Sequence, residues 1–148
     1  MKTRIWSLFL ILSLSFGTQV IRAEDNAEQV TLKGYFIKRA DNTYLHIEMV
    51  GVRMIIKLLD ENHQEIENVF TRGVMTVNAK GKSRERMVIR PVGDGIKLQS
   101  SKTIRKPHLL KVNGRLYQGE DTTTGEPFNL QYNQHTVEEV TVAPKPKE

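Results

Sequence analysis

Residues 44–59 read Tyr-Leu-His-Ile-Glu-Met-Val-Gly-Val-Arg-Met-Ile-Ile-Lys-Leu-Leu, and this stretch decides the fold class. From Tyr44 to Met49 apolar and polar residues alternate, which is the pattern of a strand with one buried face. Residues 52–59 carry a second alternating run, in which both faces hold apolar side chains. The stretch therefore predicts two strands and no helix.

The same period of two continues through most of the chain. Residues 30–36 alternate before the turn residues Asp41-Asn42, so we expect them to form a hairpin with residues 44–49. Residues 60–63 are expected to turn the chain towards Ile66 and Phe70. The alternation continues at Met75 and Val77, Met87 and Ile89, Ile96 and Leu98, Leu110 and Val112, and Phe128, Leu130 and Tyr132. Glycine-containing turns are expected between these runs, at Lys80-Gly81-Lys82, Gly93-Asp94-Gly95, Asn113-Gly114 and Thr124-Gly125.

Eight or more short strands at this spacing predict an all-β domain. We favour a single antiparallel β-sandwich of the immunoglobulin-like kind, because the runs are short and packed sheets each bury one face. A small closed barrel of eight strands with a ligand cavity is the alternative, since alternation alone does not distinguish closure from stacking.

The first 23 residues have the layout of a secretory signal peptide. Lys2 and Arg4 form a basic start, residues 5–16 are mostly apolar, and Ala23 offers a small residue for cleavage. An uncleaved anchor helix is the competing interpretation. We expect a signal helix at 1–23, an exported β domain at 24–133 and a flexible C-terminal tail at 134–148. The expected location is the periplasm or the cell exterior.

Charge is unevenly distributed along the chain. The full sequence has 22 Lys and Arg against 17 Asp and Glu, and loss of residues 1–23 leaves 19 against 17, a net charge of +2. Residues 80–115 carry a net charge of +9, whereas the rest of the mature chain carries −7. The basic residues of this segment are Lys80, Lys82, Arg84, Arg86, Arg90, Lys97, Lys102, Arg105, Lys106, Lys111 and Arg115.

Three of these arginines are expected on one strand face. Arg84, Arg86 and Arg90 alternate with the apolar residues Met87 and Ile89, so their guanidinium groups should project together from the outside of the sheet. If neighbouring strands pair in sequence order, the eleven residues form a cationic face for anionic lipids, acidic glycans or an acidic protein. The opposing interpretation is that acidic residues at 60–67 and 120–126 lie opposite the basic strands and neutralise them.

Several classes of chemistry lack their residues. The chain has no cysteine, which excludes disulfides, thiolate zinc sites and cysteine nucleophiles. Gly81-Lys82-Ser83 resembles the end of a phosphate-binding loop, but Thr76 stands where that loop needs its first glycine. No serine lies in a Gly-x-Ser-x-Gly motif, and the carboxylate pairs Glu65/Glu67 and Glu120/Asp121 are not embedded in apolar sequence. We predict a non-enzymatic protein without cofactor or nucleotide.

Copper(I) is the metal that the available donors suit best, because thioether and imidazole groups are its usual ligands. The candidates are His46, Met49, Met54, Met75, Met87 and His108. Strand parity places His46 and Met49 on opposite faces, so we expect methionines in the core, a solvated pair of His46 with Glu48, and no metal site. Nucleic acid is not expected as a partner, because the chain is exported and the basic segment lacks interleaved aromatic residues.

The order of elements over residues 44–132 resembles the small periplasmic β-sandwich domains associated with adaptor subunits of heavy-metal efflux pumps. The resemblance lies in the strand at 44–49, the turn at 60–66, the segment Met87-Val-Ile-Arg-Pro91 and the closing Pro127-Phe-Asn-Leu130. In those domains a His-Gly-Gly start and a turn glycine are common, whereas this chain has Leu32-Lys-Gly34 and His63. The resemblance implies an exported immunoglobulin-like module without catalysis.

The function expected from these observations is a binding module of the bacterial cell envelope, with the basic segment as its surface. Two alternatives follow from the resemblance and from the barrel interpretation: a periplasmic accessory domain for metal efflux, and a small barrel that binds an apolar ligand.

Overall fold

The computed structural model describes residues 29–120 and 123–143. Within these residues the protein is all-β and antiparallel, as predicted, and no helix is long and apolar enough to cross a membrane. The strands are β1 (Val30–Lys38), β2 (Tyr44–Val50), β3 (Arg53–Leu59), β4 (Phe70–Ala79), β5 (Glu85–Val92), β6 (Lys97–Ser100), β7 (Leu109–Gln118), β8 (Glu126–Asn133) and β9 (Glu138–Val142).

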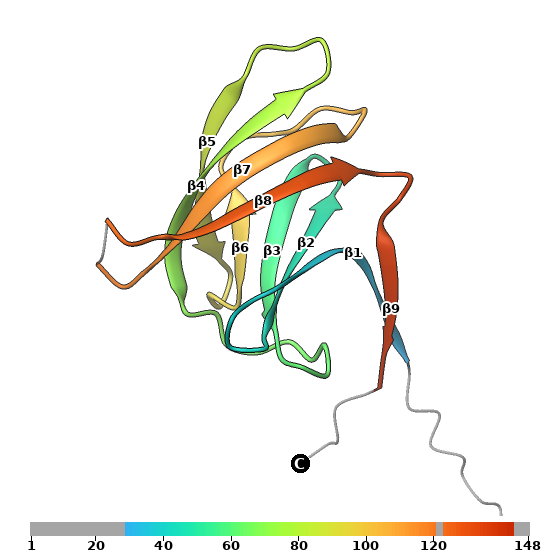
Figure 1. The fold of residues 1–148 in the computed structure, drawn as a ribbon, viewed down its shortest axis with the longest axis vertical. Helices are drawn as coiled ribbons and strands as arrows, with labels where there is room; N and C mark the ends of the chain where they lie inside the picture. The colour runs from blue at the N-terminus through green and yellow to red at the C-terminus, as the bar shows by residue number, and fades with distance from the viewer. Residues whose placement is uncertain (1–28, 121–122, 144–148) are drawn as a thin grey trace, which may run out of the picture.

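All nine strands belong to one continuous sheet, in the order β8-β7-β4-β5-β6-β3-β2-β1-β9. The short strand β6 is the link in its middle, because its residues pair with β5 on one side and with β3 on the other. The sheet curls into a half-barrel, so that β8, β7, β4 and β5 face β3, β2 and β1 across a common interior (Figure 1).

Side chains connect the two sides of the half-barrel where β8 approaches β1. The Asn133 amide N–H donates to the Tyr35 hydroxyl at 3.0 Å. At the other end of the same approach, Arg39 donates from Nε and Nη2 to the two carboxylate oxygens of Glu126, at 2.8 and 2.9 Å. This two-point hydrogen bond raises the pKa of Arg39 above its ordinary value. The curl is therefore held by hydrogen bonds that lie outside the strand ladders.

The interior of the half-barrel is filled by one apolar core. Alternate residues of β2 to β8 point into it, together with Ile104 from the loop before β7. Its fully buried members include Leu45, Ile47, Met54, Ile56, Met75, Ile89, Leu98, Val112 and Leu116.

The preference for a sandwich of two sheets requires correction. Two halves do face each other across a core, but β6 pairs with both and joins them into one sheet. Only the four residues Lys97–Ser100 make this connection, and the alternating pattern of so short a run does not reveal how many neighbours it has.

Two local expectations also differ from the structure. Asn113-Gly114, expected as a turn, lies inside β7, where Gly114 pairs with Phe128 of β8. Residues 138–142, expected within a flexible tail, form β9 and pair with β1 from Val30 to Gly34. The alternation of Val140 and Val142 with Thr141 is only a weak indication of a strand, and the strand is stabilised by its pairing with β1. The expected signal helix at 1–23 lies outside the described residues.

Gly114 is required by close packing in the core. A Cβ atom at this position would overlap the ring of Phe128, which is 2% exposed. We expect Gly114→Ala to lower the free energy of unfolding by about 1–3 kcal/mol, because the ring must leave its packed position. Urea denaturation measures this loss.

The matched control is Asn113→Ala, on the exposed face of the same strand, which should change stability by less than about 0.5 kcal/mol. Combining Gly114→Ala with Phe128→Leu should cost less than the two single changes together. Additive costs would contradict the proposed contact.

Candidate functional site

All eleven basic residues of the segment 80–115 are exposed. The strands that carry them do not pair in sequence order, because β4 lies between β5 and β7. The residues therefore form two main groups rather than one strip. Arg84, Arg86, Arg90, Lys111 and Arg115 belong to the outer side of the sheet, whereas Lys80, Lys82, Lys102, Arg105 and Lys106 lie in the turn after β4 and the loop before β7. Lys97 belongs to neither group and is exposed at the start of β6.

The first group includes three arginines that line one groove. This outer-face groove encloses about 640 Å³ over β4, β5, β7 and β8. Its charged residues are Arg84, Arg86 and Arg115. The other residues that line it are Val74, Met75, Thr76, Asn113, Gly114, Pro127 and Asn129. The groove has no acidic residue among those that line it, so its charge is positive throughout.

Strand register explains why these residues meet. Arg86 pairs with Thr76, Thr76 with Asn113, and Asn113 with Asn129, which places four polar side chains in one row across four strands. Arg115 lies in the adjacent row, opposite Val74. Paired residues of an antiparallel sheet share a face, so the whole row points outward while Met87 and Ile89 point into the core.

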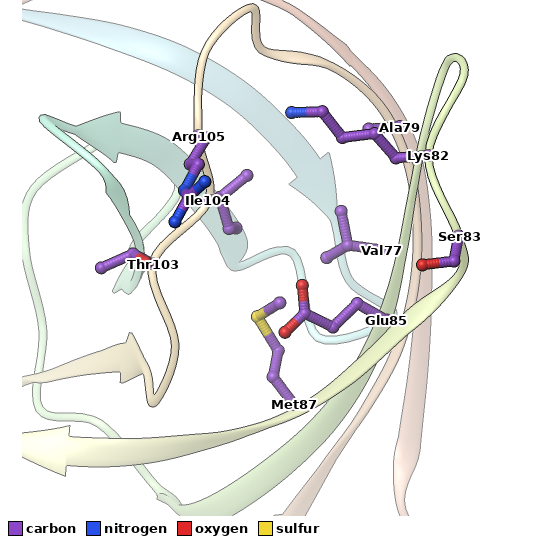
Figure 2. A pocket seen from close by; sticks show the side chains of 9 residues that line it. All are labelled: Val77, Ala79, Lys82, Ser83, Glu85, Met87, Thr103, Ile104 and Arg105. Atoms are coloured by element: carbon purple, nitrogen blue, oxygen red, sulfur yellow. The ribbon is translucent and has the colours of Figure 1, made fainter.

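Two residues of the second group, Lys82 and Arg105, line a pocket at one end of the half-barrel. This barrel-end pocket encloses about 470 Å³ between the β4–β5 turn and the loop that precedes β7 (Figure 2). Val77, Met87 and Ile104 form its apolar part, and Lys82 and Arg105 line it as well. Its charge is mixed, because Glu85 also lines it and accepts an ion pair from Lys102 at 3.1 Å.

Two acidic residues of the segments 60–67 and 120–126 have ion-pair partners outside the basic segment. Glu126 binds Arg39, and Glu65 pairs with Lys57 at 3.0 Å. Among the residues that the structure describes, Lys102 is the single member of the eleven with an ion-pair partner. The other ten cationic groups are exposed without a bound carboxylate in residues 29–120 and 123–143.

The catalytic and phosphate-binding candidates are not brought into a common site. Glu65 is held by Lys57 on the outside of the sheet, and Glu67 is exposed beside it on the segment before β4. Gly81-Lys82-Ser83 forms the exposed turn between β4 and β5 and precedes a strand. A phosphate-binding loop instead precedes a helix.

The soft metal donors are dispersed. Met54, Met75 and Met87 are buried in the core, and Met49 packs against it. His108 is buried, and its Nε2 lies 3.0 Å from the carbonyl oxygen of Ile104. In the described part of the chain no group of three or more His, Asp or Glu side chains is placed to hold a metal ion.

His46 differs most from its expected role. It does lie on the face opposite Met49, but it is fully buried rather than solvated. The ring of Phe36 stacks on it at 4.8 Å between centroids, and the absence of a side chain at Gly34 leaves room for its Nε2. Tyr44 and His63 complete a small aromatic cluster on the outside of the half-barrel. This cluster covers His46, which the alternating pattern had predicted to face solvent.

Sequence reasoning missed the neutral members of the outer-face groove. Thr76, Asn113 and Asn129 carry no charge and belong to no motif, and Asn113 was assigned to a turn. Each of them is next to a buried residue of its own strand, Val77, Val112 or Phe128, and this alternation identifies it as facing outward. Alternation does not show that the three lie side by side, because that also requires the order of the strands in the sheet.

Comparison of the chain with family models, curated proteins and solved structures finds no match. The resemblance to domains associated with metal efflux therefore stays a prediction.

The burial of His46 predicts a loss of stability in mild acid. Its Nε2–H donates to the Lys33 carbonyl oxygen at 3.1 Å, which leaves Nδ1 as a buried nitrogen without a partner. Burial lowers the pKa of His46 below 6.5, against the opposing effects of the Lys33 hydrogen bond and the Glu48 carboxylate. The unfolded chain then takes up a proton below about pH 6.5 that the folded protein does not, so folding stability should fall as pH decreases through this range.

Urea denaturation at several pH values between 8 and 5 measures the effect. His46→Phe should flatten the profile, because the ring shape is kept and the titration is removed. His135→Gln, which changes an exposed histidine, should retain the wild-type slope. Parallel profiles for the wild type and His46→Phe would contradict the assignment.

Proposed function

We propose that the protein is an exported, non-enzymatic binding module of the bacterial cell envelope, whose basic segment 80–115 binds an anionic envelope component or an acidic partner. The observation that carries the proposal is the exposure of all eleven basic side chains, with one of them in an ion pair within the described residues. Charged groups of one sign on a surface attract ligands of the opposite sign and raise their local concentration.

The location of the acidic residues supports an accessible cationic surface. Salt bridges with Arg39 and Lys57, which lie outside the basic segment, engage the carboxylates of Glu126 and Glu65. Ten of the eleven cations of the basic segment face solvent without an ion-pair partner in the described residues. Five of the eleven residues are arginines, whose planar donors match carboxylate, phosphate and sulfate groups with two hydrogen bonds each.

Export is the second part of the proposal and rests on Lys2, Arg4, the apolar run at 5–16 and Ala23. Mass spectrometry of the protein recovered from a cell-envelope fraction should give a chain that lacks about 23 N-terminal residues, because signal peptides are removed during export. Recovery of the full-length chain from the cytosolic fraction would contradict this part.

Binding to anions tests the first part. The wild type should be retained on a heparin column and on vesicles of anionic phospholipid at about 50 mM salt, and less so at about 300 mM, because salt screens exposed charges. The double substitution Arg86→Gln with Arg105→Gln removes one charge from each group and should weaken retention. Both side chains are exposed, so folding should be nearly unaffected.

The control is Lys33→Gln with Lys38→Gln, which removes the same charge from exposed residues of β1, although Lys33 is in an ion pair with Glu139 at 2.7 Å. Equal loss of retention in the two double variants would show that net charge alone matters. Retention of the wild type no stronger than that of a neutral protein would overturn the proposed binding function.

A further inference from the structure

Resting on the proposed function, we infer that the outer-face groove is the specific site of the basic face and that its ligand is an acidic glycan, a chain of sugars with carboxylate or sulfate groups. Three features of the groove favour such a ligand over other anions: its shape, its mixture of charged and neutral polar groups, and the lack of acidic and aromatic residues in its lining.

Arginine side chains flank the groove, and shorter side chains of β4 form its floor. Arg84 and Arg86 come from the β5 side and Arg115 from β7, while Val74 and Thr76 of the intervening strand β4 lie between them. Two strand spacings separate β5 from β7, which is about 10 Å. Val74 and Thr76 are shorter than arginine, so long side chains flank a shallow floor. A ligand lying over β4 would thus meet guanidinium groups on both sides.

Neutral hydrogen-bonding groups continue the same row. From Arg86 the row passes through Thr76 and Asn113 to Asn129, across four adjacent strands. Three strand spacings give it a length of about 14 Å, which exceeds the size of a single phosphate or sulfate group. Hydroxyl and amide side chains both donate and accept hydrogen bonds, as sugar hydroxyls do. The arrangement therefore suits a ligand that carries hydroxyl groups between its acidic ones.

The lining also argues against other ligands. It contains no aromatic ring on which an uncharged sugar or a base would stack. The large apolar side chains that are most exposed in the described residues lie elsewhere, at Val30, Val50, Val52, Val69 and Leu109. A membrane surface would favour projecting apolar groups that insert between lipids, whereas this site is a hollow with polar and charged walls. The barrel-end pocket is less suitable for an anion, because Glu85 lines it.

The test is calorimetric titration with a heparin-derived hexasaccharide, a polyuronate hexasaccharide and neutral maltohexaose. The wild type should bind at least one acidic oligosaccharide and not the neutral one. Arg86→Gln with Arg115→Gln should weaken binding about 10- to 100-fold, since charge-assisted hydrogen bonds are lost from both sides. Arg105→Gln with Lys106→Gln, an equal change of charge outside the groove, should weaken it by less than about threefold.

A second variant separates glycan recognition from simple charge attraction. Asn113→Ala with Asn129→Ala leaves the net charge unchanged and removes two amides that the row provides. We expect about a several-fold loss of affinity for the acidic oligosaccharide. The same variant should bind vesicles of anionic phospholipid as well as the wild type does.

The outcomes distinguish the two proposals. If the groove pair and the Arg105/Lys106 pair lose affinity equally and the asparagine pair loses none, the groove is not the site, although the basic face still binds anions. If vesicles bind through Arg86 and Arg115 while no acidic oligosaccharide binds, the ligand is a lipid and the glycan inference is wrong. If no anionic probe binds the wild type, the proposed function itself fails.

Discussion

The double pairing of β6 is the constraint on which the rest of the structure depends. Ile89 and Arg90 of β5 pair with Ser100 and Gln99 of β6, and Ile55 of β3 pairs with the same Gln99 from the other side. This short strand makes two groups of strands into one sheet that curls around one core. The Ser100 side chain strengthens the connection, because its hydroxyl accepts a hydrogen bond from the Met54 amide at 3.1 Å. Without this link, each half would expose an unpaired edge.

The outer-face groove is a product of the same arrangement. The connection from β4 to β5 is a hairpin, but β7 returns to the opposite side of β4. Residues about 30 positions apart, such as Arg86 and Arg115, thereby lie on either side of Thr76 and Val74. Because the inward residues of these strands are buried in the core, their outward partners are held in fixed rows. Because the sheet fixes the backbone from which these side chains project, binding requires little ordering of the backbone.

Alternation predicted the all-β class, the β1–β2 hairpin and the outward direction of Arg86 and Arg90. These features depend on residues close together in sequence, and the alternation of apolar and polar side chains is visible at that range. It did not predict the double pairing of β6, the burial of His46 or the contribution of Asn113 and Asn129 to the groove. The double pairing of β6 and the groove depend on pairing between segments far apart in sequence, β3 with β6 and β4 with β7. The burial of His46 depends on side-chain contacts that alternation does not report, because Phe36, its partner in the β1–β2 hairpin, stacks on the ring. Gly114 was assigned to a turn because glycine commonly permits one, whereas here it makes room for an aromatic ring.

The pairing of β9 with β1 has a consequence for engineering the chain. Val30 and Val142 are direct partners in an antiparallel ladder, so these two residues near opposite ends of the described chain lie about 5 Å apart. A short linker would suffice to join them, and the exposed turn around Gly81 would serve as the site of new termini. A circularly permuted form would begin at β5 and end at β4, and would keep all nine strands at their places in the sheet. Its new ends would lie in the β4–β5 turn, beside Lys80 and Lys82.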